Sequence, residues 1–380
     1  MQQFDTIAAL CRAASAPADE EARREAHRRW ASLAHPLGSL GLLETMLEDA
    51  AALTGSAELD FGRRAVLVLC ADNGVVAQGV TQTGPEATAA VARGLAAGQS
   101  PVCRMARVAR CEVVPVDMGI LNFSPVEGIL SCRVGNGTGD ITAGPAMTRA
   151  QAEQAVLTGA ALAARQAAAG VKLLATGEMG IGNTTTSAAV ACALLGRPAE
   201  DFTGRGAGLS DAGLARKVSA IQKALAVNRP DPADPLDVLA KVGGFDLAGL
   251  CGVFLGGAAC RVPVLADGLI STVAALCAVR LCPGAAKAVF ASHVSAEPAG
   301  RAVLDALGKK PLITAGMRLG EGTGAVACIP LWDMARAVYA ESYSFAQCGV
   351  EAYQPQGGSH WEHCSQSPVA AQVPRSPIRG

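Results

Sequence analysis

Aromatic side chains are scarce in this chain of 380 residues, because Phe, Trp and Tyr together make up only 4% of it. Glycine is abundant by contrast, with 43 residues, and half of the sequence is hydrophobic. So much apolar material excludes a disordered chain. Small side chains allow helices and strands to pack closely, with Gly-rich turns between them, which favours a layered α/β fold.

The sequence also lacks an excess of charge of either sign. Its 32 Lys and Arg residues are matched by 33 Asp and Glu residues, and the basic residues are dispersed along the chain. A surface that binds nucleic acid or an acidic membrane needs concentrated positive charge. We therefore expect a small-molecule ligand, with neither nucleic acid nor membrane as a partner.

Long apolar runs are missing too. The most apolar region, residues 247–279, is interrupted by Arg261 and Asp267, whereas a membrane-spanning helix needs about 20 apolar residues. The first residues lack the basic start and apolar core of a secretory signal, so we expect a cytoplasmic protein. The 13 cysteines are odd in number and mostly lie in apolar stretches, which favours buried reduced thiols over a disulfide framework.

Short apolar runs alternate with helical segments along most of the chain. Such alternation implies a parallel sheet, and ligands of parallel sheets bind beyond the carboxyl ends of the strands. The predicted fold class is α/β, with a Rossmann-like, mostly parallel sheet flanked by helices. The predicted strands are residues 65–70, 112–117, 171–175, 261–266 and 288–292.

The two ends of the chain differ from this pattern. Residues 19–54 predict two helices joined by a Pro/Gly turn at 35–40. From about residue 354 to 380 the composition shifts to Gln, Ser, Pro and Gly, which predicts a flexible tail. His360 and His363 in this tail are metal-like residue types, but they have no second ligand cluster, and we expect no native metal site.

The strongest local pattern is Ala-Thr-Gly-Glu-Met-Gly-Ile-Gly-Asn-Thr-Thr-Thr at residues 175–186, after a predicted strand and before a helix. Glycines and free N–H groups at a helix start can bind a phosphate. The segment lacks the Walker A and dinucleotide-binding spacings, and a tight structural turn is the alternative. Residues 204–209 and Lys217 could contact the same phosphate, although a lone lysine is more often a solvated surface charge.

Two acidic residues each allow two interpretations. Asp267 follows a predicted strand, where it could hydrogen-bond a ribose hydroxyl or cap a helix. Glu321 lies in Leu-Gly-Glu-Gly-Thr-Gly, residues 319–324, immediately before an apolar helix. It could act as a general base in a closed site, or it could stabilise the helix start through the dipole. Spacing alone favours the helix-start role.

Taken together, a series of segments resembles the nicotinate-nucleotide:dimethylbenzimidazole phosphoribosyltransferase family of cobalamin biosynthesis. The resemblance covers roughly residues 20 to 353, with the segments in the order of the family. These segments are residues 35–44, 71–75, 144–148, 177–185, 204–209, 243–245 and 320–324.

The resemblance implies a homodimer and a two-domain chain. Residues 61–324 would form the large catalytic domain, and residues 1–60 with 325–353 would form a small helical domain. It also implies transfer of phosphoribose from nicotinate mononucleotide to 5,6-dimethylbenzimidazole. The products would be nicotinate and α-ribazole 5′-phosphate, which is used in assembly of the cobalamin nucleotide loop. No cofactor and no metal are implied.

The resemblance also assigns roles to residues. Glu321 would accept the proton of the incoming base, and Glu178 would lie at the active site. The residues implied to bind the phosphate or nucleotide are Gly180, Ile181, Gly182, Asn183, Thr184, Gly206, Leu209, Lys217, Asp267 and Ser295. Those implied to bind the base are Thr81, Thr83, Pro85, Glu86 and Leu319.

Two segments depart from the family pattern. Many members have a Tyr-Pro-Gln-containing stretch where this chain has residues 80–88, so another benzimidazole, a purine or a phenolic compound stays open as acceptor. Residues 297–301 lack a His that often follows the Gly. Two other functions also stay open: a dinucleotide-dependent oxidoreductase, suggested by the alternating strands and helices, and a non-catalytic nucleotide-binding subunit of a hetero-oligomer.

Overall fold

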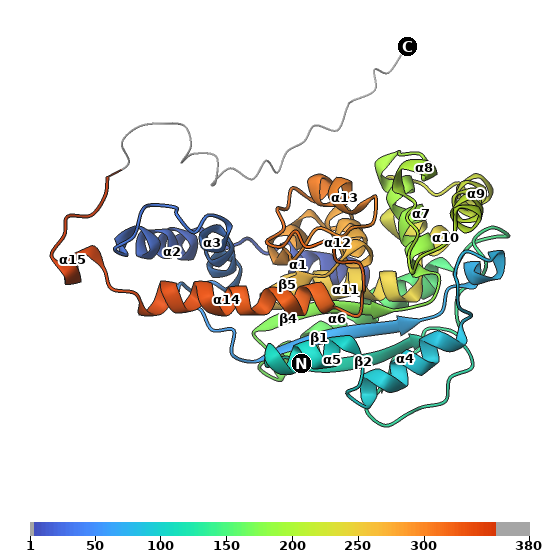
Figure 1. The fold of residues 1–380 in the computed structure, drawn as a ribbon, viewed down its shortest axis with the longest axis horizontal. Coiled ribbons are helices and arrows are strands. Elements are labelled where there is room, and N and C mark those ends of the chain that lie inside the picture. The colour runs from blue at the N-terminus through green and yellow to red at the C-terminus, as the bar shows by residue number, and fades with distance from the viewer. Residues whose placement is uncertain (1–3, 355–380) are drawn as a thin grey trace, which may run out of the picture.

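The structure, a computed structural model, describes residues 4–354 and has a six-stranded sheet at its centre (Figure 1). The strand order is β3-β2-β1-β4-β5-β6, and every neighbouring pair is parallel. This order has a topological switch point between β1 and β4. The predicted α/β class and Rossmann-like sheet are confirmed. The strands are β1 (Arg64–Ala71), β2 (Glu112–Gly119), β3 (Leu130–Ser131), β4 (Leu173–Met179), β5 (Val264–Ala266) and β6 (Val289–Ala291).

The central strand β1 shows why these residues form a sheet. All of its residues are buried, as the continuous apolar run predicts for a strand covered on both faces. The short β3 was not predicted, because two residues carry no detectable period. The strand predicted at 171–175 runs on to Met179 as β4, so Glu178 lies in a strand and not in the Gly-rich loop.

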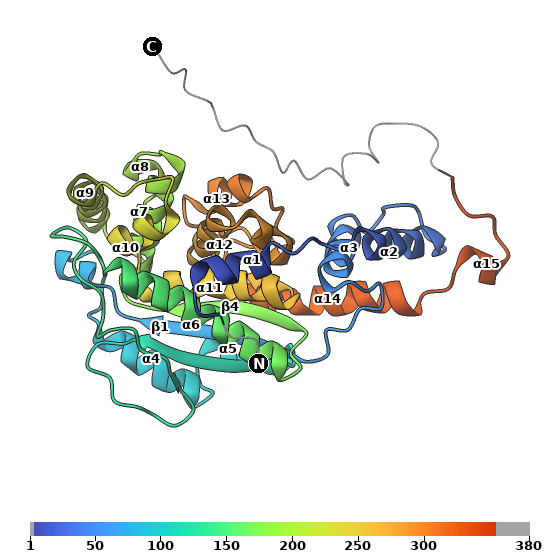
Figure 2. The ribbon, with the colours of Figure 1, turned by 180° about the vertical axis from the view of Figure 1, so that it is seen from behind.

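Helices cover both faces of the sheet (Figures 1 and 2). On one face lie α4 (Glu86–Ala96), α5 (Pro101–Val108) and the start of α14 (Thr323–Glu341). On the other lie α11 (Phe245–Cys260) and α12 (Leu269–Leu281), with α6 (Arg149–Ala168) packed along α11. A Cβ added at Gly252 of α11 would lie 1.8 Å from the carbonyl oxygen of Val156 on α6. The predicted close packing through small residues therefore occurs between these two helices.

A further group of helices stands beside the carboxyl ends of the strands, toward which the arrow of β1 points in Figure 1. They position the loops of the candidate site described below. This group comprises α7 (Asn183–Leu195), α8 (Ala199–Phe202), α9 (Asp211–Asn228) and α10 (Pro235–Val242). Three short helices lie elsewhere along the chain: η1 (Gly74–Gln78) follows β1, η2 (Pro283–Ala288) precedes β6 and packs on α11 and α12, and α13 (Gly300–Leu307) packs on α12.

A smaller helical region extends from one side of the sheet (Figure 2). It contains α2 (Glu20–Ser32) and α3 (Leu42–Thr54), as the period of residues 19–54 predicts, together with the second half of α14 and the short α15 (Phe345–Cys348). The rings of Trp30 and Tyr339 lie 5.1 Å apart, and the Tyr339 hydroxyl donates to the carbonyl oxygen of Ala57 at 2.9 Å. Helix α14 thus connects the sheet to this region.

The first helix lies elsewhere. Helix α1 (Ile7–Ala14) packs against α11, α6 and η2, beside the sheet and not with α2 in Figure 1. This corrects the predicted grouping of all of residues 1–60 with the small domain, because the apolar face of α1 is buried on α11. The other predicted domain limits stay predictions. Of the tail predicted at 354–380, only Gln354 lies within the described residues, and His360 and His363 lie outside them.

Candidate active site

A cavity of about 400 Å³ lies at the carboxyl end of the sheet, where the loops after β4, β5 and β6 meet. Residues 80–83, 205–207, 209 and 318–321, with Lys217 of α9, complete its wall. The end of β4 is one side of the topological switch point, the usual place for a ligand in an open α/β sheet. The loops gather where the parallel-sheet prediction placed them.

Most of the residues predicted for the site line this one cavity. Pro85 and Glu86 do not: Glu86 begins α4, and its carboxylate accepts a hydrogen bond of 3.2 Å from the amide of Gly84. The predicted residues that line the cavity are Thr81, Thr83, Glu178, Gly180, Ile181, Gly182, Asn183, Thr184, Gly206, Leu209, Lys217, Asp267, Ser295, Leu319 and Glu321.

The Gly-rich segment makes a tight connection from β4 into α7. A Cβ at position 180 would lie 2.3 Å from the carbonyl oxygen of Ala71, so only Gly180 fits there. Gly182 precedes α7 with a φ of 93°, a conformation that Gly adopts without strain. Within residues 4–354 the amides of Gly182 and Thr184 donate no hydrogen bond. Two free N–H groups at a helix start, on the wall of the cavity, can hold an anion.

Lys217 lies beside this helix start and is 1% exposed. Its ammonium group donates to the Thr184 hydroxyl at 2.8 Å and to the Gly204 carbonyl oxygen at 3.1 Å. Burial lowers the pKa of Lys217 to about 8, against the opposing effect of Glu297. The interpretation of Lys217 as a solvated surface charge was wrong, because α9 turns this residue toward α7. A buried ammonium with one neutral hydroxyl partner is suited to receive a phosphate.

The loop before α14 has an unusual backbone. Gly320, Glu321 and Gly322 have φ values of 93°, 59° and 90°. A positive φ is uncommon for a residue with a side chain and persists only where its surroundings hold it. Here the amide of Glu321 donates to the carbonyl oxygen of Glu178 at 3.2 Å.

The Glu321 carboxylate accepts a hydrogen bond of 3.3 Å from the amide of Val102. Burial raises the pKa of Glu321, while the hydrogen bonds from Val102 and Ser100 act against this. A carboxylate at a cavity wall with a raised pKa can accept a proton near neutral pH. The structure therefore places Glu321 where both of its predicted roles are physically available.

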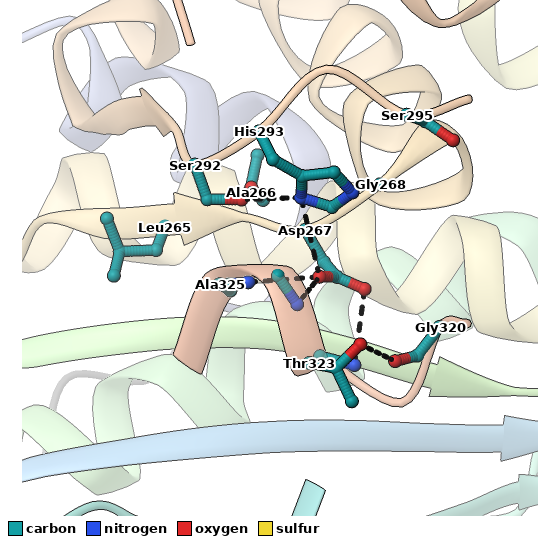
Figure 3. A network of polar contacts seen from close by, with 12 residues as sticks. Leu265, Ala266, Asp267, Gly268, Ser292, His293, Ser295, Gly320, Thr323 and Ala325 are labelled. Atoms are coloured by element: carbon teal, nitrogen blue, oxygen red, sulfur yellow. Dashed lines mark hydrogen bonds and ion pairs between the residues drawn. The ribbon is translucent and has the colours of Figure 1, made fainter. Parts of the chain in front are cut away.

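Asp267 caps a helix, but not the one that follows it in the sequence (Figure 3). Its Oδ1 accepts hydrogen bonds from the amides of Gly324 at 2.7 Å and Ala325 at 3.0 Å, and its Oδ2 accepts from Gly322 at 3.2 Å. The helix-cap interpretation is confirmed for the start of α14. Asp267 also lines the cavity, and its contact with a ribose hydroxyl stays a prediction.

Some residues of the site were missed in the sequence. His293 belongs to none of the sequence motifs, yet its Nδ1 lies 3.1 Å from the Ser292 hydroxyl and 4.0 Å from Asp267 Oδ1 (Figure 3). Burial lowers the pKa of His293, although Asp267 opposes this. Arg318 lines the cavity mouth without belonging to any motif, so no sequence signal marked it.

Asp246 is the most deeply buried of the missed residues. It lies in the first turn of α11 and is 0% exposed. The side-chain amide of Asn183 donates to Asp246 Oδ2 at 3.0 Å and also to a carboxyl oxygen of Glu178. Burial, followed by the charge of Asp246, raises the pKa of Glu178 to about 8. The adjacent Gly243-Gly-Phe245 segment was the only signal that could have drawn attention to Asp246.

Metal-binding side chains do not gather in the part of the chain that the structure describes, since no three His, Cys, Asp or Glu residues there could hold one ion. Nor does any helix of residues 4–354 combine the length and the apolar character that crossing a membrane requires.

Comparisons with known proteins agree on one family. A family model described as "Phosphoribosyltransferase" matches residues 15–350. The nicotinate-nucleotide–dimethylbenzimidazole phosphoribosyltransferase of Acetivibrio thermocellus is 46% identical over 329 residues, which is 87% of this chain and 94% of that protein. The protein of the same name from a Roseiflexus species is 46% identical over 335 residues, 88% of this chain and 95% of that one.

The comparison of structures points the same way. The crystal structure of CobT from Thermus thermophilus superposes with a TM-score of 0.83 at 40% sequence identity. The match covers 88% of this chain and all of that one.

Proposed function

Because this chain belongs to the nicotinate-nucleotide–dimethylbenzimidazole phosphoribosyltransferase family, we propose that it transfers phosphoribose from nicotinate mononucleotide to 5,6-dimethylbenzimidazole. The products are nicotinate and α-ribazole 5′-phosphate. The observation that carries this proposal is a single cavity with an anion-binding helix start and a buried lysine on one wall, and Glu321 on another.

The phosphate end of the cavity supports nicotinate mononucleotide as the donor. The free amides of Gly182 and Thr184 and the ammonium group of Lys217 would bind the 5′-phosphate, with Gly206 beside them. Three donors around one phosphate would fix the position of the ribose, because each charge-assisted hydrogen bond restrains its orientation. The anomeric carbon C1′ would then lie over the carboxyl end of β4, between Glu178 and Glu321.

The two carboxyl groups of the cavity, on Glu178 and Glu321, support the transfer reaction. Departure of nicotinate from C1′ develops positive charge on the ribose, which a nearby carboxylate stabilises. Glu321 would take the proton from the ring nitrogen of the incoming base, and this deprotonation makes the other nitrogen a better nucleophile. Attack on the face opposite the leaving group converts the β-nucleotide into an α-nucleotide.

The acceptor would bind in the same cavity, beside the ribose. Thr81, Thr83 and Leu319 line it, and the names of the relatives favour dimethylbenzimidazole over other bases. The comparisons lend no support to the oxidoreductase or to the non-catalytic subunit. The cytoplasmic location and the homodimer stay predictions.

A product assay tests this proposal. Purified full-length protein is incubated with nicotinate mononucleotide and each of dimethylbenzimidazole, benzimidazole, adenine and phenol, and nicotinate and the new nucleotide are separated by chromatography. We expect stoichiometric release of both products, fastest with dimethylbenzimidazole. Release of neither product with any of the four bases would refute the function.

A further inference from the structure

Two carboxyl groups share one amide beneath the floor of the cavity. The Nδ2 of Asn183, the first residue of α7, donates one hydrogen bond to Glu178 of β4 and another, of 3.0 Å, to Asp246 of α11. Glu178 is 7% exposed and Asp246 is 0% exposed. Neither carboxyl forms an ion pair with any Lys, Arg or His of residues 4–354. Two buried carboxylates without a cation between them cannot both ionise at low cost.

The backbone around this cluster leaves little room for it to change. A Cβ at Gly180 would lie 2.8 Å from Asp246 Oδ2, and a Cβ at Gly244 would lie 2.4 Å from Asp246 Oδ1. Both glycines belong to the motifs that predicted the site. The carboxylate of Asp246 therefore lies directly against the backbone of both glycines, and a side chain at either position would displace it.

We propose that Asp246 is a positioning residue whose negative charge keeps the Glu178 carboxyl protonated, while the side-chain amide of Asn183, which the two carboxyls share, fixes the orientation of that carboxyl at the cavity. The proposal rests on the proposed function, in which Glu178 faces the bound nucleotide. In this arrangement Asp246 carries the negative charge and is satisfied by Asn183 and by the amide of Leu247, at 3.0 Å. Glu178 carries the proton and presents an O–H donor to the cavity.

The groups that face Glu178 from the neighbouring elements agree with this assignment. They are Asp246 on α11, Asp267 after β5, Glu321 before α14 and the Cys70 thiol on β1. Burial and the charges of Asp246, Asp267 and Glu321 raise the pKa of Glu178 to about 8, against the hydrogen bond from Asn183. The pKa of Asp246 rises only to about 6. Three backbone amides donate to the Asp267 carboxylate and stabilise its negative charge. This charge also raises the pKa of Glu178.

If Glu178 is protonated, the two acids of the site have different roles: Glu178 donates a hydrogen bond and Glu321 accepts a proton. An ionised Glu178 would repel the phosphate and carboxylate of nicotinate mononucleotide, while the neutral acid can donate a hydrogen bond to the bound nucleotide. Glu321 is then free to act as the ionised proton acceptor. Two carboxyls with separated pKa values are the usual basis for such a division.

The pH dependence of kcat at saturating nicotinate mononucleotide tests the proposal, because the deprotonation of Lys217 near the same pH acts on the affinity for the nucleotide. With the wild type, activity is expected to fall above a pH of about 8 as Glu178 ionises. Asp246→Asn keeps the shape of the side chain but removes the like charge, so Glu178 ionises more readily. We expect the alkaline limb to move down by about one pH unit or more. Asp117→Asn removes another buried carboxylate, at the end of β2, and is expected to leave the limb in place.

Glu178→Gln is the second test of the proposal, because glutamine is a permanently neutral hydrogen-bond donor of similar shape. It is expected to retain activity to within about tenfold and to lose the alkaline limb. In the Glu178→Gln background, Asp246→Asn should no longer shift the profile. A limb that Asp246→Asn does not move, or a Glu178→Gln enzyme as inactive as Glu178→Ala, would overturn the proposal.

A spectroscopic measurement keeps the test decisive if Asp246→Asn does not fold. Infrared difference spectra of the wild type at neutral pH should contain a protonated carboxyl band that Glu178→Gln removes. Persistence of every such band in Glu178→Gln would also overturn the proposal. This readout needs no turnover, so a failure of the proposed function, seen as absent nicotinate release by the wild type, is distinguished from a failure of the inference.

Discussion

The backbone amide of Glu321 donates a 3.2 Å hydrogen bond to the carbonyl oxygen of Glu178, so the two acids of the cavity are joined through their main chains. The backbone of β4 also approaches the Glu321 loop closely at Gly177. A Cβ at Gly177 would lie 2.5 Å from the carbonyl oxygen of Glu321. The end of β4 and the loop before α14 are therefore in direct backbone contact, and this contact requires a residue without a side chain at position 177.

Gly177→Ala should lower kcat by about tenfold to a hundredfold, because the new methyl group displaces the Glu321 loop and small displacements of catalytic groups are costly. Steady-state assays of nicotinate release measure it. Gly94→Ala on α4 is the matched control, since no atom lies within 4 Å of its added Cβ. Equal kcat values for the two variants would contradict the role of the contact.

Glu321→Gln should lower kcat by about a hundredfold to a thousandfold, because an amide cannot accept the proton of the base. The KM for nicotinate mononucleotide should change much less, since the phosphate is bound at the other end of the cavity. Circular dichroism checks the fold, and Glu112→Gln, at the exposed start of β2, is the control. Full activity of Glu321→Gln would remove the general-base assignment.

Asp267→Ala should reduce the free energy of unfolding by about 2 kcal/mol, because the amides of Gly322, Gly324 and Ala325 lose their shared acceptor. Denaturant titration measures this loss. Asp267→Asn retains one acceptor oxygen and should lose less stability. If both variants are as stable as the wild type, the cap does not stabilise α14.

Lys217→Met should raise the KM for nicotinate mononucleotide about tenfold or more, because the phosphate loses a charged donor. Lys223→Met on the same helix changes an exposed lysine and should leave KM unaltered. The wild-type enzyme adds a pH signature. Burial lowers the pKa of Lys217 to about 8, so the charged form prevails below that pH. The affinity for nicotinate mononucleotide should weaken as the pH rises through it, and an affinity independent of pH would contradict this.

Much of the architecture could be predicted from local sequence. The apolar run at 65–70 predicted β1 because a strand covered on both faces needs no polar residue. The glycines of 175–186 marked a strand-to-helix connection because their backbone must approach Ala71 and adopt a positive φ at Gly182. Such features depend on a residue and its immediate neighbours, and the order of the motifs along the chain was enough to suggest the family.

The electrostatics of the site depended on contacts between distant segments. No local pattern shows that Lys217 is buried against Thr184, that Asp267 caps α14 instead of its own helix, or that Asp246 and Glu178 share the amide of Asn183. The sequence by itself determined the strands, the turns and the chemical types available at the carboxyl end of the sheet. Only the tertiary structure decided which charges face one another, because burial and proximity set the protonation of a carboxyl group, and both arise only when the sheet brings its loops together.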